Sequence, residues 1–125
     1  MKKIISTKNA PAAIGPYSQA VEAGGLIFIS GQLPIDPATG AMAPAEIKAQ
    51  TEAVLKNIDG ILKAEGLALE NVLKTTVFMA DLGQFAQMNE VYSKFFPANA
   101  PARATIEVKA LPRAALVEIE AVAAR

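Results

Sequence analysis

Apolar residues recur at the spacing of one helix face through the middle of the chain. The pattern predicts a helix over Glu46–Glu65, about 30 Å long. Pro44 suits a helix start, and Gly66 suits the left-handed position just after a helix end. Gly60, inside the helix, indicates a close packing contact. The apolar positions are Ile47, Val54, Leu55, Ile58, Ile61 and Leu62.

A second helix is predicted between Asp81 and Pro97. Asp81 is a suitable N-cap, and Gln84 three residues later gives a start that resembles a capping box. Proline at position 97 ends the pattern. The apolar stripe of this helix is Phe85, Met88, Tyr92 and Phe95.

Six further segments have the composition of β-strands. Gly24-Gly25 predicts a tight hairpin between the second and third of them. The stretch Pro34–Gly40 holds two prolines and a glycine and is predicted to be a loop. The predicted strands are Ile4–Thr7, Ser18–Glu22, Leu26–Gln32, Val72–Met79, Arg103–Lys109 and Val117–Ala123.

This element order indicates an α+β domain with a sheet of about six strands and two helices. Two helices can cover one face of such a sheet. In Leu26–Ile29 both alternating faces are apolar, which is typical of a strand covered on both sides. We therefore expect the second face to be buried in an oligomer.

The composition of the chain argues against several classes of function. A length of 125 residues fits one domain, and 12 basic residues balance 12 acidic ones. Zero net charge gives little basis for nucleic-acid binding. Without cysteine or histidine the chain lacks a thiol nucleophile and the commonest general base and metal ligands. The N-terminal apolar run is too short for a signal peptide or a membrane span, so we expect a soluble cytoplasmic protein.

The candidate chemistry centres on Arg103 and Glu118, on two neighbouring extended segments. A guanidinium binds carboxylates or phosphates bidentately. Antiparallel pairing of the two segments would bring the side chains together, but the sequence does not fix the register. The alternative is a surface ion pair of Arg103 with Glu118 or Glu107, worth about 0–1 kcal/mol.

Other candidate groups flank the strands. Tyr17 follows a turn and offers a hydroxyl, or it caps a core edge. Ser30 and Gly31 at a strand end offer a hydroxyl and a backbone N–H, or they form a plain bulge. Asn89 lies beside the stripe of the second helix, where a buried amide needs a partner.

Four stretches together resemble the reactive intermediate deaminase family, also called Rid or YjgF, and its RidA-like imine deaminases. They extend along essentially the whole chain, from position 9 to position 119. The stretches are Asn9–Ala20, Ser30–Pro34, Val72–Leu82, and Pro101-Ala102-Arg103 with Leu111-Pro112 and Val117-Glu118-Ile119.

The resemblance implies a single RidA-like domain over residues 1–125 with a chorismate-mutase-like fold. It implies a homotrimer with a central barrel and sites in the clefts between subunits. The implied reaction hydrolyses 2-imino acids, tautomers of enamines such as 2-aminoacrylate, to 2-oxo acids and ammonia, with no cofactor and no metal. A protonated imine is already electrophilic, so carboxylate recognition, water positioning and a proton acceptor suffice.

By the same resemblance, Arg103 grips the substrate carboxylate and Glu118 positions or activates the attacking water. Tyr17, Ser30, Gly31 and Asn89 match positions that line the cleft. Thr105 stands where many relatives carry cysteine; its hydroxyl can still bind substrate. An alternative function is a non-catalytic protein that binds or senses a small carboxylate such as a 2-oxo acid, for which Arg103 alone suffices. A ribonuclease function is disfavoured by the neutral charge, few aromatics and absent histidine.

Overall fold

The computed structural model describes residues 1–125 and contains the six strands and two long helices that the sequence predicts. β3 and β4 match their predicted ranges, and the ends of the other strands and of α1 differ from the predicted ones by at most two residues, as is common where chain ends fray. Three short 3₁₀ turns, η1 to η3, connect the longer elements. The strands are β1 Lys3–Ile5, β2 Ala20–Ala23, β3 Leu26–Gln32, β4 Val72–Met79, β5 Ala102–Glu107 and β6 Val117–Ala124; the helices are α1 Ile47–Ala64 and α2 Phe85–Phe95; the turns are η1 Leu69–Asn71, η2 Leu82–Gln84 and η3 Pro112–Ala114.

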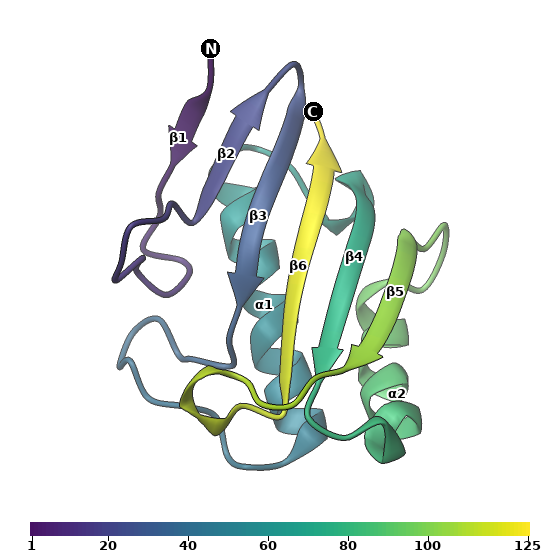
Figure 1. Ribbon diagram of the computed structural model, residues 1–125. Helices are drawn as coiled ribbons and strands as arrows, with labels where there is room; N and C mark the ends of the chain where they lie inside the picture. Colours follow the sequence, from purple (N-terminus) through teal and green to yellow (C-terminus); the bar gives the residue numbers. More distant parts are fainter.

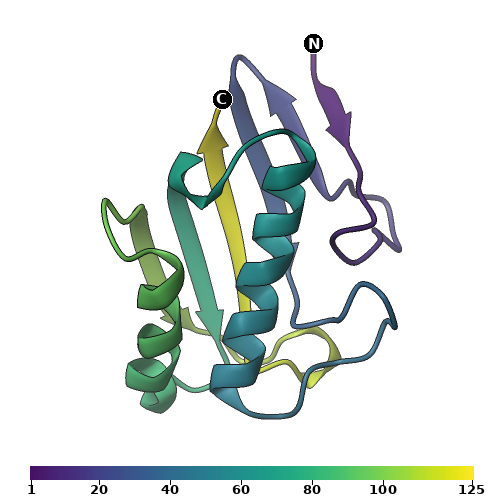
Figure 2. The ribbon, with the colours of Figure 1, turned by 180° about the vertical axis from the view of Figure 1, so that it is seen from behind.

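The strands form one mixed sheet in the order β1-β2-β3-β6-β4-β5 (Figure 1). All neighbours pair antiparallel except β4 and β5, which are parallel. Both long helices lie on the same face, as the view from behind shows (Figure 2). The predicted α+β class is confirmed. The antiparallel pairing of Arg103–Lys109 with Val117–Ala123 that was considered from the sequence does not form, because β4 lies between β5 and β6.

Helix α1 packs its predicted stripe onto the sheet, and all six of its apolar positions are buried. Gly66 adopts φ +73° after the helix end, and the amides of Gly66 and Leu67 donate to the carbonyls of Lys63 and Leu62. These two bonds form a Schellman cap, which satisfies carbonyls that a helix end leaves unpaired.

The predicted start of the second helix needs a correction. Asp81 accepts a hydrogen bond from the Gly83 amide and caps η2, whereas α2 begins four residues later at Phe85. Gln84 makes no side-chain cap bond, so there is no capping box. Met88 and Tyr92 of the predicted stripe are buried, but Phe85 is exposed. No helix of the protein is long and apolar enough to cross a membrane.

The two faces of the sheet differ sharply in burial. On the helix face, Ile27, Val77 and Ile119 are fully buried. On the open face, Phe28 is 45% and Ile106 43% exposed. The expectation that Leu26–Ile29 is covered on both sides therefore holds on one side only within a single chain. An open apolar face of this kind is typical of a surface that meets another protein.

Three connections gather at the lower end of the sheet in Figure 1: the segments before β2, after β3 and before β6. Buried polar groups of α1 hold two of them. Gln50 accepts a hydrogen bond from the Leu116 amide at 2.8 Å, and the Asn57 amide donates to the carbonyls of Leu33 and Ile35 at 3.1 and 2.9 Å. A helix that is otherwise apolar toward the core thus fixes the loops at this end of the molecule.

Candidate functional site

Arg103 lies at the start of the edge strand β5 and points to the helix face. Its pairing with buried Thr75 of β4 sets this direction, because residues opposite each other in a sheet share a face. Nη1 of Arg103 donates to Oδ1 of Asn89 on α2 at 2.7 Å. The structure thus supplies a partner for the Asn89 amide, which the sequence left open. Neither of the ion pairs considered from sequence, with Glu107 or Glu118, forms.

Two aromatic rings of α2 flank the guanidinium. Its central carbon lies 4.7 Å from the ring centroid of Tyr92 and 5.4 Å from that of Phe85, within the range of cation–π attraction. The Tyr92 hydroxyl in turn lies 2.7 Å from the Thr75 hydroxyl in the core. Burial raises the pKa of Tyr92, although the Thr75 bond and Arg103 act in the opposite direction. The guanidinium is therefore oriented by groups that leave most of its five N–H donors available.

A cavity of about 370 Å³ opens beside this arginine. It is bounded by residues of α2 and of the segment before β5. No carboxylate of the chain neutralises Arg103. The lining residues include Asn89, Tyr92, Phe96, Pro101 and Arg103.

Thr105 follows two residues along β5 and shares the face of Arg103, opposite Val77. Its Oγ1 is the one buried side-chain oxygen or nitrogen of the protein that has no hydrogen-bond partner. A buried hydroxyl without a partner costs about 1–3 kcal/mol, so such groups are uncommon in folded proteins and call for an explanation.

Glu118 occupies the start of β6 and points to the open face, opposite Phe78 of β4. Its carboxylate lies against the backbone of Gly31, so closely that a Cβ on Gly31 would overlap with Oε2 of Glu118. The sheet register is irregular between Ile29 and Gln32, which identifies Ser30-Gly31 as the bulge considered from sequence. Only glycine at position 31 leaves room for the carboxylate there.

Burial raises the pKa of the Glu118 carboxyl, and the nearby Glu120 adds to the shift. No group of the chain donates a hydrogen bond to this carboxylate. A carboxylate that is partly desolvated and free of donors is well suited to accept a proton.

A cavity of about 620 Å³ surrounds Glu118 at the lower end of the sheet. Its size is typical of a small-molecule site. Tyr17 projects from the segment before β2 and is 53% exposed. The Ser30 hydroxyl already donates to the Ser18 carbonyl at 2.6 Å, so it can only accept from a ligand. The residues that line the cavity include Pro11, Ile14, Tyr17, Ser30, Gly31, Arg113, Glu118 and Glu120.

The structure divides the predicted site residues into two groups on opposite faces of the sheet. One group surrounds Glu118 on the open face, and the other surrounds Arg103 on the helix face. Arg103 and Glu118 are separated by two strand spacings and by three residues along the strands, so their backbones lie about 14 Å apart. The two side chains do not meet within one chain. The first group is Tyr17, Ser30, Gly31 and Glu118; the second is Asn89, Arg103 and Thr105.

Sequence reasoning assigned Phe85 and Tyr92 to the core stripe of the second helix and did not connect them with Arg103. Their spacing relative to Asn89 carried a weak signal, because Phe85, Asn89 and Tyr92 are three or four residues apart and share one side of a helix. The sequence alone does not show that α2 lies beside β5.

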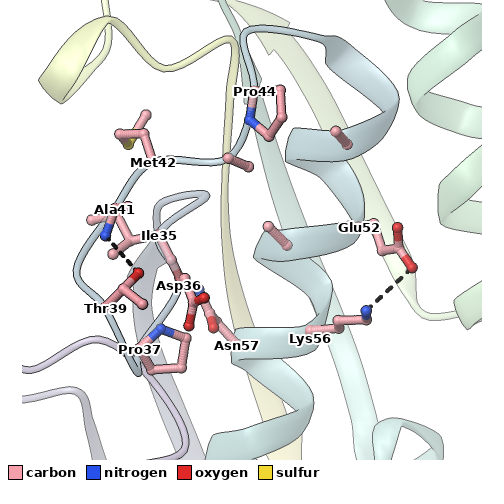
Figure 3. A pocket seen from close by; sticks show the side chains of 13 residues that line it. Ile35, Asp36, Pro37, Thr39, Ala41, Met42, Pro44, Glu52, Lys56 and Asn57 are labelled. Atoms are coloured by element: carbon pink, nitrogen blue, oxygen red, sulfur yellow. Dashed lines mark hydrogen bonds and ion pairs between the residues drawn. The ribbon is translucent and has the colours of Figure 1, made fainter.

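Figure 3 shows a separate cavity of about 510 Å³ between the 35–44 loop and α1. Its charged groups satisfy one another rather than converge: Lys56 pairs with Glu52 at 3.3 Å, and Asp36 accepts a bond from the Ala38 amide. None of the predicted site residues lines it. The predicted site residues other than Thr105 line the two cavities described above.

The sequence matches the family model described as Endoribonuclease L-PSP over residues 7–125. The chain belongs to the Rid/YjgF family. It is 50% identical to the 2-iminobutanoate/2-iminopropanoate deaminase of Mus musculus over 98% of this chain and 91% of that protein. It is 48% identical to the crystal structure of the YjgF gene product of E. coli, with a TM-score of 0.94 over 98% of both chains.

A second solved relative contains a bound ligand. The crystal structure of E. coli TdcF with bound serine is 45% identical to this chain, with a TM-score of 0.94 over 98% of both chains. The family match covers both cavities described above, since it includes Tyr17, Arg103 and Glu118. The resemblance inferred from the sequence motifs is confirmed.

Proposed function

We propose that this protein is a 2-iminobutanoate/2-iminopropanoate deaminase, which hydrolyses 2-imino acids and their enamine tautomers to 2-oxo acids and ammonia. The name of the mouse relative at 50% identity supports the activity. The observation that carries the proposal is a pair of half-sites, one around Arg103 and one around Glu118. No carboxylate neutralises the arginine, and no donor bonds to the glutamate. These groups provide carboxylate recognition and proton acceptance, which imine hydrolysis requires.

In this mechanism Arg103 binds the substrate carboxylate through the N–H donors that Asn89 leaves free. The rings of Tyr92 and Phe85 hold the guanidinium in place, and Asn89 fixes its rotation. The bound serine of the TdcF structure supports a cleft for small amino-acid-like carboxylates in this family. The substrate class of this chain follows from that chemistry.

Glu118 accepts a proton from water as the water oxygen attacks the carbon of the protonated imine. Glu118 passes this proton to the nitrogen of the resulting tetrahedral intermediate. It then takes up the hydroxyl proton as the C=O bond forms and the C–N bond breaks, and the released ammonia receives that proton. The iminium and water thus give the 2-oxo acid and ammonium, with atoms and charge balanced. Tyr17 and the Gly31 backbone border the same cavity and orient the water or the substrate.

The assembly in this proposal is a homotrimer in which one subunit supplies Arg103 and a neighbour supplies Glu118. Two observations support it. The half-sites lie on opposite faces and do not meet within one chain, and Phe28 and Ile106 leave the open sheet face apolar and exposed. Packing of three open faces would form the central barrel. We propose a single domain over residues 1–125 that acts in the cytoplasm.

The experiment uses a serine or threonine dehydratase to generate 2-aminoacrylate, and follows the release of keto acid with and without this protein. Wild type should accelerate the release, and Arg103→Ala should lower kcat/KM by about 10²- to 10³-fold, because it removes a charged partner of the substrate carboxylate. The exposed residue Lys94 of α2 lines neither cavity, so Lys94→Ala removes the same charge and should leave kcat/KM unchanged. Wild type that leaves the uncatalysed rate unchanged would contradict the deaminase function.

A second candidate function is a non-catalytic protein that binds small carboxylates. The Arg103 half-site favours it, since Arg103 is oriented without any help from Glu118. The family description Endoribonuclease L-PSP raises a third activity. Zero net charge and the absence of histidine favour the small-molecule functions over RNA. RNA cleavage that persists in Arg103→Ala would place a nuclease activity outside this site.

Thr105→Val should raise the stability of the protein and lower its turnover. Valine replaces the unpartnered buried hydroxyl by a methyl group of similar shape, so we expect the free energy of unfolding to rise by about 1 kcal/mol. If the hydroxyl donates to bound substrate, turnover should fall by about tenfold. Urea denaturation and the coupled assay measure the two effects. Thr105→Ser keeps the hydroxyl and should keep turnover; equal activity of the valine and serine variants would remove Thr105 from the substrate site.

The raised pKa of Glu118 predicts how stability depends on pH. The folded protein holds this proton more tightly than the unfolded chain, so the contribution of Glu118 is fully present below its unfolded pKa and is lost as pH rises through the folded pKa. Glu118→Gln is uncharged throughout. We therefore expect the glutamine variant to be more stable than wild type at pH 7, and the difference to shrink toward pH 4. Urea midpoints at the two pH values test this; a difference that does not depend on pH would contradict it.

A further inference from the structure

Four hydrogen bonds join the side chain of Gln19 to the backbone of residues 7–11, in the segment before β2. The side chain is 3% exposed. Its Oε1 accepts from the Thr7 amide at 2.6 Å, and its Nε2 lies 3.0, 3.1 and 2.8 Å from the carbonyls of Thr7, Ala10 and Pro11. One buried amide therefore satisfies four backbone groups of residues 7–11, a stretch that makes no regular secondary structure.

The backbone of the same glutamine is fixed from the other side. The amide of Ser30 donates to the Gln19 carbonyl at 3.0 Å, and the Ser30 hydroxyl donates to the carbonyl of Ser18. Ser30 precedes Gly31, on which the Glu118 carboxylate rests. Gln19 is thus joined through its main chain to the bulge beside Glu118, and through its side chain to residues 7–11.

Helix α1 packs against the same turn at Asn9. A Cβ on Gly60 would overlap with the carbonyl oxygen of Asn9, so the absence of a side chain at Gly60 admits the turn against the helix. This explains the glycine inside α1 that the sequence indicated as a packing contact. The Asn9 amide also bonds to the Thr7 hydroxyl at 3.1 Å.

Between these two anchors, residues 12–17 carry little support of their own. Ile14 is 90% and Tyr17 53% exposed, and the one backbone bond within the stretch joins the Tyr17 amide to the Gly15 carbonyl at 2.8 Å. Both side chains line the cavity of Glu118. The position of Tyr17 over that cavity therefore depends on the anchors at the ends of the segment.

We propose that Gln19 is a positioning residue for the deaminase reaction: it holds residues 12–17 so that Tyr17 borders the Glu118 cavity, and Gly60 provides the space that this requires. The inference rests on the function proposed above. Gln19 holds Tyr17 beside Glu118, where the water attacks, whereas the substrate carboxylate binds to Arg103 of a neighbouring subunit in the proposed trimer. Substitution of Gln19 should therefore lower kcat more than it changes KM.

The test uses the two tyrosines of the chain, Tyr17 and Tyr92. Protein labelled with 3-fluorotyrosine gives two ¹⁹F resonances, which Tyr17→Phe assigns. In Gln19→Met, which keeps the length of the side chain but removes its hydrogen bonds, the Tyr17 resonance should shift or broaden while that of Tyr92 stays. A displacement of about 1 Å at a reacting group lowers turnover by up to about 10²-fold, so kcat should fall by tenfold or more with KM within about twofold.

Asn71→Ala is the matched control. Asn71 also makes two side-chain bonds to the backbone, to Ala68 and Ala124, but at the far end of the sheet. It should lower thermal stability without moving the Tyr17 resonance or kcat. Gly60→Ala is the second variant: it keeps Gln19 but displaces Asn9, and should move Tyr17 in the same direction even if Gln19→Met does not fold.

An unchanged Tyr17 resonance in both variants would overturn the proposal, as would an equal shift of Tyr92, which reports a general loss of structure. A change in KM alone would also overturn it. The fluorine signal does not depend on turnover. If wild type hydrolyses no imine, the proposed function fails, while a selective shift of Tyr17 still supports the anchoring role of Gln19.

Discussion

Co-expression of Arg103→Ala with Glu118→Gln should restore deaminase activity that neither variant shows alone. The reason is geometric: Arg103 and Glu118 lie on opposite faces of the sheet, and in the proposed trimer a complete site combines Arg103 of one subunit with Glu118 of another. A trimer that contains both variants holds one intact cleft among three, so about one third of wild-type turnover per trimer is expected. Two affinity tags, one on each variant, isolate the mixed oligomers before the assay.

The control is the double variant Arg103→Ala/Glu118→Gln, co-expressed with Arg103→Ala. These oligomers contain no Arg103 and should stay inactive. Verified mixed oligomers of the single variants that also stay inactive would show that the two half-sites do not combine across subunits, and the proposed cleft would be wrong. Intermediate mixing ratios give a further check, because activity should follow the fraction of clefts in which both residues are native.

The half-sites could not be placed relative to each other from sequence. Alternation along β6 indicates that Val117 and Ile119 face the core and Glu118 faces away, and the structure agrees. The same reasoning for β5 would turn Ala104 and Ile106 toward the core. The structure reverses it: Arg103 and Thr105 face α2, and Ile106 is on the open side.

This reversal has a physical cause in the position of β5. It is an edge strand, and α2 presents Asn89 and two aromatic rings to it rather than an aliphatic stripe. An arginine is accommodated there by one hydrogen bond and by cation–π contacts. Nothing local to residues 101–109 encodes that environment, since it depends on the parallel pairing of β5 with β4.

Features with local periodicity or turn chemistry were predictable. Helix α1 differs from its predicted range by one residue at each end, because its stripe, Gly66 and the following leucine act within a few residues of one another. The Gly24-Gly25 hairpin is confirmed as well: both glycines have positive φ, at +59° and +78°, as a tight antiparallel turn with two left-handed residues requires. Strand order and the contacts of Gln19 depend on residues distant in sequence and were not predictable in this way.

Glu118→Gln should abolish most turnover and leave carboxylate binding intact. Glutamine keeps the shape of the side chain over Gly31 but cannot accept a proton from the attacking water, and general-base catalysis contributes about 10²- to 10⁴-fold. Arg103 on the opposite face is unchanged, so a 2-oxo acid should bind to the variant as it does to wild type. Isothermal titration with pyruvate measures the binding, and the dehydratase-coupled assay measures kcat.

The dependence of wild-type kcat/KM on pH is a second test of the role of Glu118. The base form of Glu118 is required, and burial raises its pKa from the ordinary value, so kcat/KM should fall on acidification at a higher pH than an exposed glutamate would give. The residual activity of Glu118→Gln should lack this acidic limb. Retained turnover in the variant together with retained binding would remove Glu118 from the chemistry. Lost turnover with retained binding separates a deaminase from a carboxylate-binding protein, because only the deaminase needs the glutamate.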